Sequence, residues 1–192
     1  MTELEYRKRN SKGHTARASA VDSTAIPAMM AILAGDESLA RQQARQSLVD
    51  IGKPAVAPLM KALKSPESNF HLRWEAAKAL SELEDPAAAP ALIRALEDDD
   101  NFSVRWLAAE GLIALGRDGL APLLKALVKR SNSASLREGA HHVLRMLDEG
   151  DLHYQVAPVL AALEDIEPVL EVPVAAHAAL DALGETNALS AR

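Results

Sequence analysis

The fold of this chain is decided by the stretch Ser103-Val-Arg-Trp-Leu-Ala-Ala-Glu-Gly-Leu-Ile-Ala-Leu-Gly116. A serine of the kind that caps helices begins the stretch and a glycine ends it, so the stretch is predicted to form one helix. Arg105, Ala108 and Leu112 recur within it at steps of three and four residues, which places them on one helical face. A second apolar run follows a glycine-containing turn, with Pro122 near its start, where a proline is tolerated. The unit therefore predicts two short antiparallel helices.

This unit recurs along the chain with a period of 32 residues. The columns that share this spacing are Arg41, Arg73, Arg105 and Arg137; Ala44, Ala76, Ala108 and Ala140; Leu48, Leu80, Leu112 and Leu144; and Pro58, Pro90 and Pro122. Self-similarity at a fixed period of this size is typical of a stacked-repeat solenoid, in which each unit buries its apolar face only against its neighbours. The sequence therefore predicts an all-α solenoid of about five helix pairs.

The repeats also predict where the helices lie and how the chain is divided. Helices of the arginine-bearing type are expected at residues 38–51, 70–83, 103–115, 134–147 and 172–183. The proline-bearing type is expected at residues 24–34, 54–64, 87–97, 119–129 and 154–164. The solenoid then spans residues 24–185, between a disordered basic leader over residues 1–23 and a C-terminal tail over residues 186–192. The first and last helices carry almost no charge, so the ends are expected to be covered by the tails or to mediate self-association.

Composition narrows the classes of function. The 192 residues include no cysteine, which excludes disulfides and thiolate metal sites. No apolar run is long enough to span a membrane and residues 1–20 lack the apolar core of a signal peptide, so we expect a cytoplasmic protein without membrane contact. The net charge of −6 lies in the body of the chain, because the leader is basic. An acidic body makes nucleic-acid binding an unfavoured alternative.

The stretches around Arg73 and Arg105, each followed by a proline-containing helix, resemble HEAT repeats. They are most similar to the short bacterial type named after phycobilisome lyases, and the resemblance covers residues 24–185. It implies a right-handed solenoid whose arginine-bearing helices line a concave surface. It also implies that each arginine pairs with an acidic residue in the preceding turn, and Asp36, Glu67 and Asp99 are suitably placed for this. Ser131 stands at the matching place before Arg137, so that pairing is not expected there.

The arginine-bearing helices lack the recognised motifs for catalysis or metal binding. The HEAT-like enzyme deoxyhypusine hydroxylase binds iron through His-Glu pairs, but the matching dipeptides here begin at Gln42, Trp74, Trp106 and Glu138 and contain no histidine. The adjacent His141 and His142 point about 100° apart on a helix and do not converge on one metal ion. We therefore expect no catalytic residue, no metal site and no cofactor, and we expect that the chain is not an enzyme.

The candidate binding residues lie on the arginine-bearing helices. Trp74 and Trp106 share a column one repeat apart, and large aromatic residues favour interface hot spots. The same two side chains are also explained as packing between repeats, and the sequence leaves both interpretations open. The full set of partner-binding candidates is Trp74, Lys78, Trp106, Glu110, Glu138 and His142.

This mixture of charges suits a protein or peptide ligand better than a polyanion. The expected function is thus a non-catalytic scaffold or adaptor that binds a protein or peptide in its concave groove. One alternative is an enzyme-associated or lyase-like subunit, because the related phycobilin lyases act on a chromophore held between repeat surfaces. A HEAT-like DNA-binding or DNA-repair protein is a weaker alternative, since the tryptophans here lack the basic surroundings of such enzymes.

Overall fold

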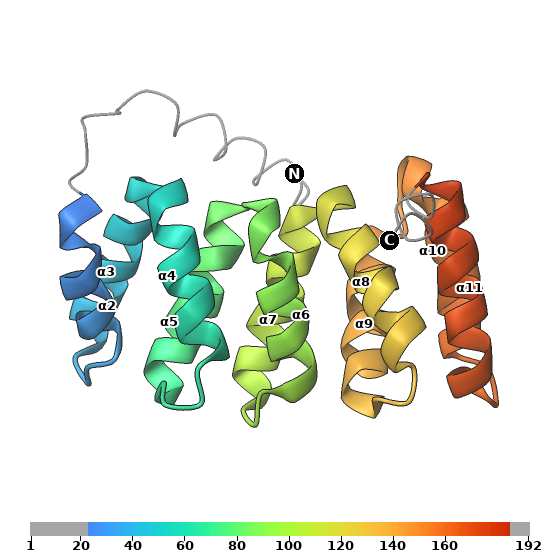
Figure 1. The fold of residues 1–192 in the computed structure, drawn as a ribbon, viewed down its shortest axis with the longest axis horizontal. Coiled ribbons are helices and arrows are strands. Elements are labelled where there is room, and N and C mark those ends of the chain that lie inside the picture. Colours follow the sequence, from blue (N-terminus) through green and yellow to red (C-terminus); the bar gives the residue numbers. More distant parts are fainter. Residues whose placement is uncertain (1–22, 185–192) are drawn as a thin grey trace, which may run out of the picture.

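The computed structural model describes residues 23–184, which form a row of helices stacked side by side (Figure 1). The helices are α2 (Ile26–Leu33), α3 (Ser38–Ile51), α4 (Lys53–Lys64), α5 (Phe70–Leu83), α6 (Ala89–Asp98), α7 (Phe102–Leu115), α8 (Arg117–Arg130), α9 (Ala134–Leu147), α10 (His153–Leu163) and α11 (Pro168–Ala182). Short 3-10 turns precede three of them: η1 (Ser23–Ala25), η2 (Pro86–Ala88) and η3 (Gly150–Leu152). The all-α solenoid is confirmed, and the predicted boundaries hold to within a few residues. Apart from Ser23, the predicted leader and tail lie outside the described residues.

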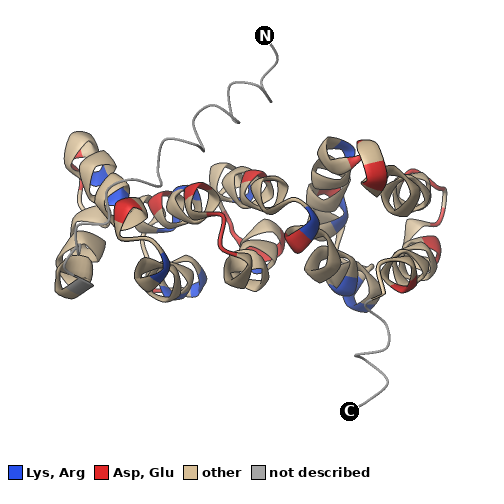
Figure 2. Cartoon of the chain, turned by 90° about the horizontal axis from the view of Figure 1, so that it is seen from above, with Lys and Arg blue, Asp and Glu red and all other residues tan. Residues whose placement is uncertain are grey.

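The helices pack in two layers, which Figure 2 shows from above. Helices α3, α5, α7 and α9 each pack against the next and carry the recurring arginines; we call them the arginine layer. Helices α2, α4, α6 and α8 pack in the same way and form the proline layer. Each pair of helices spans about one repeat of the sequence, so residues 32 apart occupy equivalent places on neighbouring helices of the same layer. None of the described helices combines the length and apolarity needed to span a bilayer.

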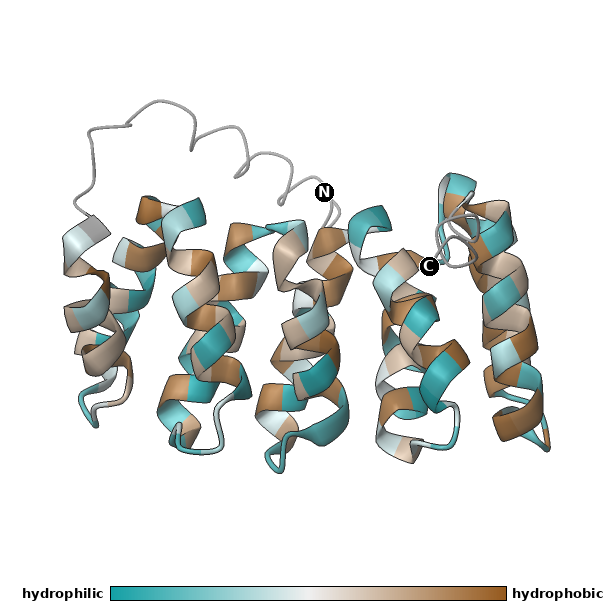
Figure 3. Ribbon diagram, in the orientation of Figure 1, coloured by the Kyte–Doolittle hydropathy of each residue, from teal (hydrophilic) through white to brown (hydrophobic). Residues whose placement is uncertain are grey.

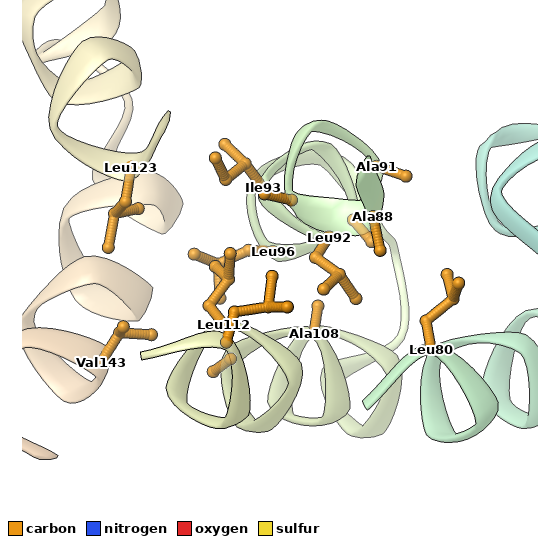
Figure 4. Close-up of a cluster of buried hydrophobic side chains, with 14 of the residues drawn as sticks. Leu80, Ala88, Ala91, Leu92, Ile93, Leu96, Ala108, Leu112, Leu123 and Val143 are labelled. Atoms are coloured by element: carbon orange, nitrogen blue, oxygen red, sulfur yellow. The ribbon is translucent and has the colours of Figure 1, made fainter. Parts of the chain in front are cut away.

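The core lies between the layers and is built from the leucine and alanine columns. Leu112 and Ala108 of α7 are fully buried and face Leu92 of α6 in Figure 4. Small residues in the arginine layer let the leucines of the other layer approach closely: a Cβ added at Gly139 of α9 would overlap Leu96 of α6. Interdigitation of large and small side chains gives the close packing that fixes the spacing of the repeats.

The recurring arginines bind the backbone of the turn that precedes their own helix. The Nη1 of Arg73 donates to the Ser68 carbonyl at 2.7 Å and that of Arg105 to the Asp99 carbonyl at 2.8 Å. Arg137 donates in the same way to the carbonyl of Ser131. The pairing with an acidic side chain of the preceding turn is therefore wrong in its chemistry, because the acceptor is a main-chain carbonyl. This also explains why a serine at position 131 does not break the pattern.

The carboxylate partners of these arginines come instead from the following repeat. Arg73 Nε lies 2.8 Å from Asp99 Oδ2, in the next turn of the array, and Glu67 plays no part in that pair. Glu75 of α5 is buried and lies 2.8 Å from Arg45 Nη1 and 3.4 Å from Arg41 Nε, both on α3. Burial strengthens charge-assisted contacts and makes them costly to break, so these ion pairs join neighbouring repeats firmly.

The last pair departs from the predicted arrangement. Residues 154–164 were expected in the proline layer and residues 172–183 in the arginine layer, but α10 packs against α9 and α11 packs against α8. The two helices are thus exchanged between layers. The sequence is irregular at the same place: Pro158 stands 36 residues after Pro122, and Val169 stands where the arginine column would continue after Arg137. The 32-residue spacing is therefore lost in the final pair.

Candidate functional site

The predicted binding residues lie on the outward face of the arginine layer. Three capped helix starts set their register. The Asn69 side chain accepts the Leu72 N–H at the start of α5, and the Asn101 side chain accepts the Ser103 N–H at the start of α7. Ser133 caps α9 in the same manner. Caps of this type fix where a helix begins, and they place the columns that contain Trp74, Trp106 and Glu138 side by side.

Trp106 anchors a row of aromatic rings that joins α7 to α9. Its side chain is 46% exposed. Its ring centroid lies 4.5 Å from that of His142, with the planes tilted by 31°, and 6.4 Å from that of Phe102. Both separations fall in the range where ring pairs interact favourably. We call Phe102, Trp106 and His142 the aromatic row. Phe102 was not among the predicted residues, although its position one helical turn before Trp106 indicated that the two side chains share a face.

Glu110 orients the histidine of this row. The His142 Nε2 lies 3.4 Å from Glu110 Oε1, one repeat away on α7, and both side chains are half-buried. A carboxylate at that nitrogen can accept a hydrogen bond from the tautomer that carries its proton there. The structure therefore brings three of the six predicted residues together, namely Trp106, Glu110 and His142.

Of the other three predicted residues, Trp74 and Lys78 stand apart from this cluster, and Glu138 lies one helical turn before His142. Trp74 is half-buried and packs against the hydrophobic core, unlike Trp106 in the same column. Lys78 lies 3.9 Å from Glu82, one turn along α5. Glu138 is exposed on α9 in the column of Trp106 and supplies a carboxylate beside the aromatic row. Trp74 thus fits the packing interpretation, whereas the exposed Trp106 stays a predicted binding residue.

The remaining histidines of α9 and α10 join structural elements. His141 Nε2 lies 2.9 Å from Glu164 Oε1 at the end of α10, and His153 Nδ1 lies 2.7 Å from Asp148 Oδ1 in the preceding turn. Both contacts hold the last pair to α9. Within residues 23–184, no three His, Asp or Glu side chains are grouped so that they could hold a metal ion.

Two surface hollows lie elsewhere. One is lined by α4 residues that include Met60, Lys61 and Lys64, and the other lies between Pro86, α8 and Leu183. The aromatic row belongs to neither hollow and is an open surface. A ligand at this site would therefore lie across the helices, with its far side covered by a partner or by solvent.

Comparison with known proteins agrees with this architecture. A family model for HEAT repeats matches residues 26–113 and, in a second alignment, residues 68–145. Among solved structures, the chain is similar to a chain from the complex of CpcE and CpcF of phycocyanin lyase from Nostoc sp. PCC7120. That match has 28% sequence identity and a TM-score of 0.57, and it covers 82% of this chain and 99% of that chain. A search of curated protein sequences returned no match.

The structural match corrects one expectation. The sequence contains no recognisable catalytic motif, and the chain was therefore expected not to be an enzyme. The similarity to a phycocyanin lyase complex contradicts that expectation and points to lyase-related activity.

Proposed function

The chain belongs to the HEAT-repeat family, and we propose that it is a lyase-related subunit that holds a chromophore on the aromatic row. The observation that carries the proposal is the match to a chain of a phycocyanin lyase complex over 99% of that chain's length. HEAT repeats also favour a protein partner, so the proposed substrate is a chromophore that is transferred to or from a partner protein.

The aromatic row suits a planar conjugated ligand. Trp106 and His142 already stack on each other, and the exposed part of the indole offers a further π-surface. Offset stacking on such a ring contributes about 0.5–1.5 kcal/mol beyond the area that it buries. A linear tetrapyrrole is planar over much of its length and carries pyrrole N–H donors, which the carboxylate of Glu138 beside the row can accept.

His142 is the residue of this surface that is best suited to proton transfer. In an elimination from the chromophore, a base takes the proton from the carbon next to the breaking bond, a double bond forms, and the partner protein's group leaves with the electron pair; an imidazole can take up that proton. Glu110 acts through it as a positioning residue, because its Oε1 faces the His142 Nε2 at 3.4 Å. The proposed roles are thus stacking for Trp106, proton transfer for His142 and orientation for Glu110.

Titration of the full chain with biliverdin, a linear tetrapyrrole, tests the proposal. We expect a change in the visible absorbance of the pigment and quenching of tryptophan fluorescence. Trp106→Ala should weaken binding about tenfold, which corresponds to about 1.4 kcal/mol. Trp74→Ala is the matched control, because it removes the same side chain from the equivalent place on the neighbouring repeat and should leave binding nearly unchanged.

The chemical assignment needs a second variant. His142→Gln should retain most of the pigment binding but lose the transfer of pigment when the chain is co-expressed with bilin-producing enzymes and a phycocyanin subunit. Absence of any spectral change with biliverdin, or equal weakening by the two tryptophan variants, would exclude the aromatic row as the chromophore site.

A further inference from the structure

The C-terminal end of the array exposes a large apolar surface. On α11, Leu170 and Val174 stand one turn apart and point outward, and Val174 is 67% exposed. Ile166, in the turn before this helix, is 97% exposed. The lower end of α11 is correspondingly hydrophobic in Figure 3. Terminal units of repeat arrays are normally polar on their outer face, so this surface requires an explanation.

The N-terminal end is apolar as well, but with smaller side chains. Helix α2 contains no charged residue, and its outer face presents Ala28 and Ala31 to solvent. Ile32 follows on the same helix, and Leu39 at the start of α3 is 66% exposed. The surface at one end is thus built from large side chains and the surface at the other end mainly from small ones.

The two apolar surfaces lie toward the same edge of the array. The loops within the helix pairs line up along one edge in Figure 1. Ile32 and Leu39 flank the first of these loops, and Ile166 lies in the last one. The layers at the two ends also match. The exchange in the last pair places α11 beside α8, in the proline layer that contains α2. It places α10 beside α9, in the arginine layer that contains α3.

We propose that these ends dock on each other in two copies of the chain, with α10–α11 of one copy stacked on α2–α3 of the next. Both layers would then continue across the junction, with α10 and α11 antiparallel to the helices α3 and α2 that they meet. Leu170 and Val174 would pack over the small residues Ala28 and Ala31, which is the same large-on-small packing seen between the repeats. The inference does not depend on the proposed lyase-related function.

A symmetric junction between two C-terminal ends is disfavoured by charge. Glu167, Glu171 and Asp181 lie along the exposed face of α11, and facing copies would bring six carboxylates together. The uncharged α2 removes this repulsion over the length of the helix. Some repulsion remains between Asp36 and Glu37 of one loop and the acidic α10–α11 loop, so salt should strengthen the association by screening it.

Analytical ultracentrifugation of the full chain, across a hundredfold range of concentration, tests the junction. The average mass should rise with concentration, and it should rise further between 50 mM and 500 mM NaCl. A head-to-tail contact leaves one unsatisfied end on each copy, so growth beyond the dimer or closure into a ring is expected.

Paired variants distinguish this junction from a symmetric one. Val174→Glu blocks one end and Ala31→Glu blocks the other, and each protein alone should be a monomer. An equimolar mixture should form a dimer that grows no further, because each variant contributes one intact end. Ala57→Glu is the matched control, since this exposed alanine lies mid-helix on α4 and should leave self-association unchanged.

Three outcomes would overturn the proposal. They are a wild-type chain that stays monomeric throughout, a mixture of the two blocked variants that stays monomeric, and a single blocked variant that still dimerises alone. Circular dichroism melts of every variant establish that loss of association does not arise from unfolding.

Discussion

Replacing Glu75 with glutamine tests the strongest link between neighbouring repeats. Its carboxylate lies 2.8 Å from Arg45 and 3.4 Å from Arg41, and the three side chains are only 5%, 13% and 12% exposed, respectively. Glutamine keeps the shape of the side chain but removes the buried carboxylate from two largely buried guanidinium groups, of which Arg45 keeps only the more exposed Glu82. Breaking a buried pair in this way costs about 3–5 kcal/mol.

The two arginines keep some contact with solvent, so we expect the lower end of that range, about 3 kcal/mol. For a chain of this size the melting temperature should fall by roughly 6–12 °C, at about 2–4 °C for each kcal/mol. The assay is urea unfolding followed by circular dichroism, supported by thermal melts. Glu82→Gln is the control, because Glu82 lies 3.4 Å from the same Arg45 but its side chain is 28% exposed, and it should cost about 0.5 kcal/mol or less.

A double-mutant cycle with Arg45→Met isolates the pair itself. We expect a coupling energy between Glu75 and Arg45 of about 1–3 kcal/mol, within the range for contacting residues. Equal destabilisation by Glu75→Gln and Glu82→Gln, or a coupling energy near zero, would refute the argument that burial of this ion pair ties the repeats together.

Three further predictions concern the core and the tryptophans. Leu112→Ala, in the central repeat, should destabilise the chain by about 2–5 kcal/mol in urea unfolding. Leu180→Ala, in the last pair, should cost less although both side chains are buried, and equal losses would contradict an array in which each repeat is stabilised only by its neighbours. Gly139→Ala should cost about 1–3 kcal/mol in the same melts, because the added methyl overlaps a leucine of α6, and an unchanged midpoint would show that the two helices separate easily. In single-tryptophan variants, acrylamide should quench the fluorescence of Trp106 strongly and that of Trp74 weakly. Trp74→Ala should lower the free energy of unfolding more than Trp106→Ala. The reverse order in either measurement would contradict the burial of Trp74 and the exposure of Trp106.

The period of the sequence carried most of the information about the fold. Helix boundaries followed from the 32-residue spacing and from cap residues such as Asn69 and Ser133, because these are local features of the chain. The exchange of α10 and α11 between layers did not follow, since it depends on packing against α8 and α9. The absence of an arginine at Val169 indicated that the last unit is irregular, but it did not indicate how its two helices are placed.

The site was predicted in part for the same reason. The 32-residue spacing placed Trp106, Glu110 and His142 on one face, where the structure brings them into contact. It could not separate Trp74 from Trp106, because equivalent positions differ in burial only through the neighbouring repeats. Glu75 shows the converse case: its column holds Leu107 in the next repeat, and nothing in the sequence singled it out as a buried anion.

The arginine contacts with turn carbonyls have a consequence for how this scaffold can change. A main-chain carbonyl is present whatever the side chain, so the brace at each turn places no demand on the identity of the turn residues. Acid and hydroxyl side chains accordingly alternate at the acceptor positions while the same contact is kept. Acceptor residues whose side chains make no other contact can therefore diversify, or be redesigned to recognise a new molecule, while the helix caps at the same edge stay fixed.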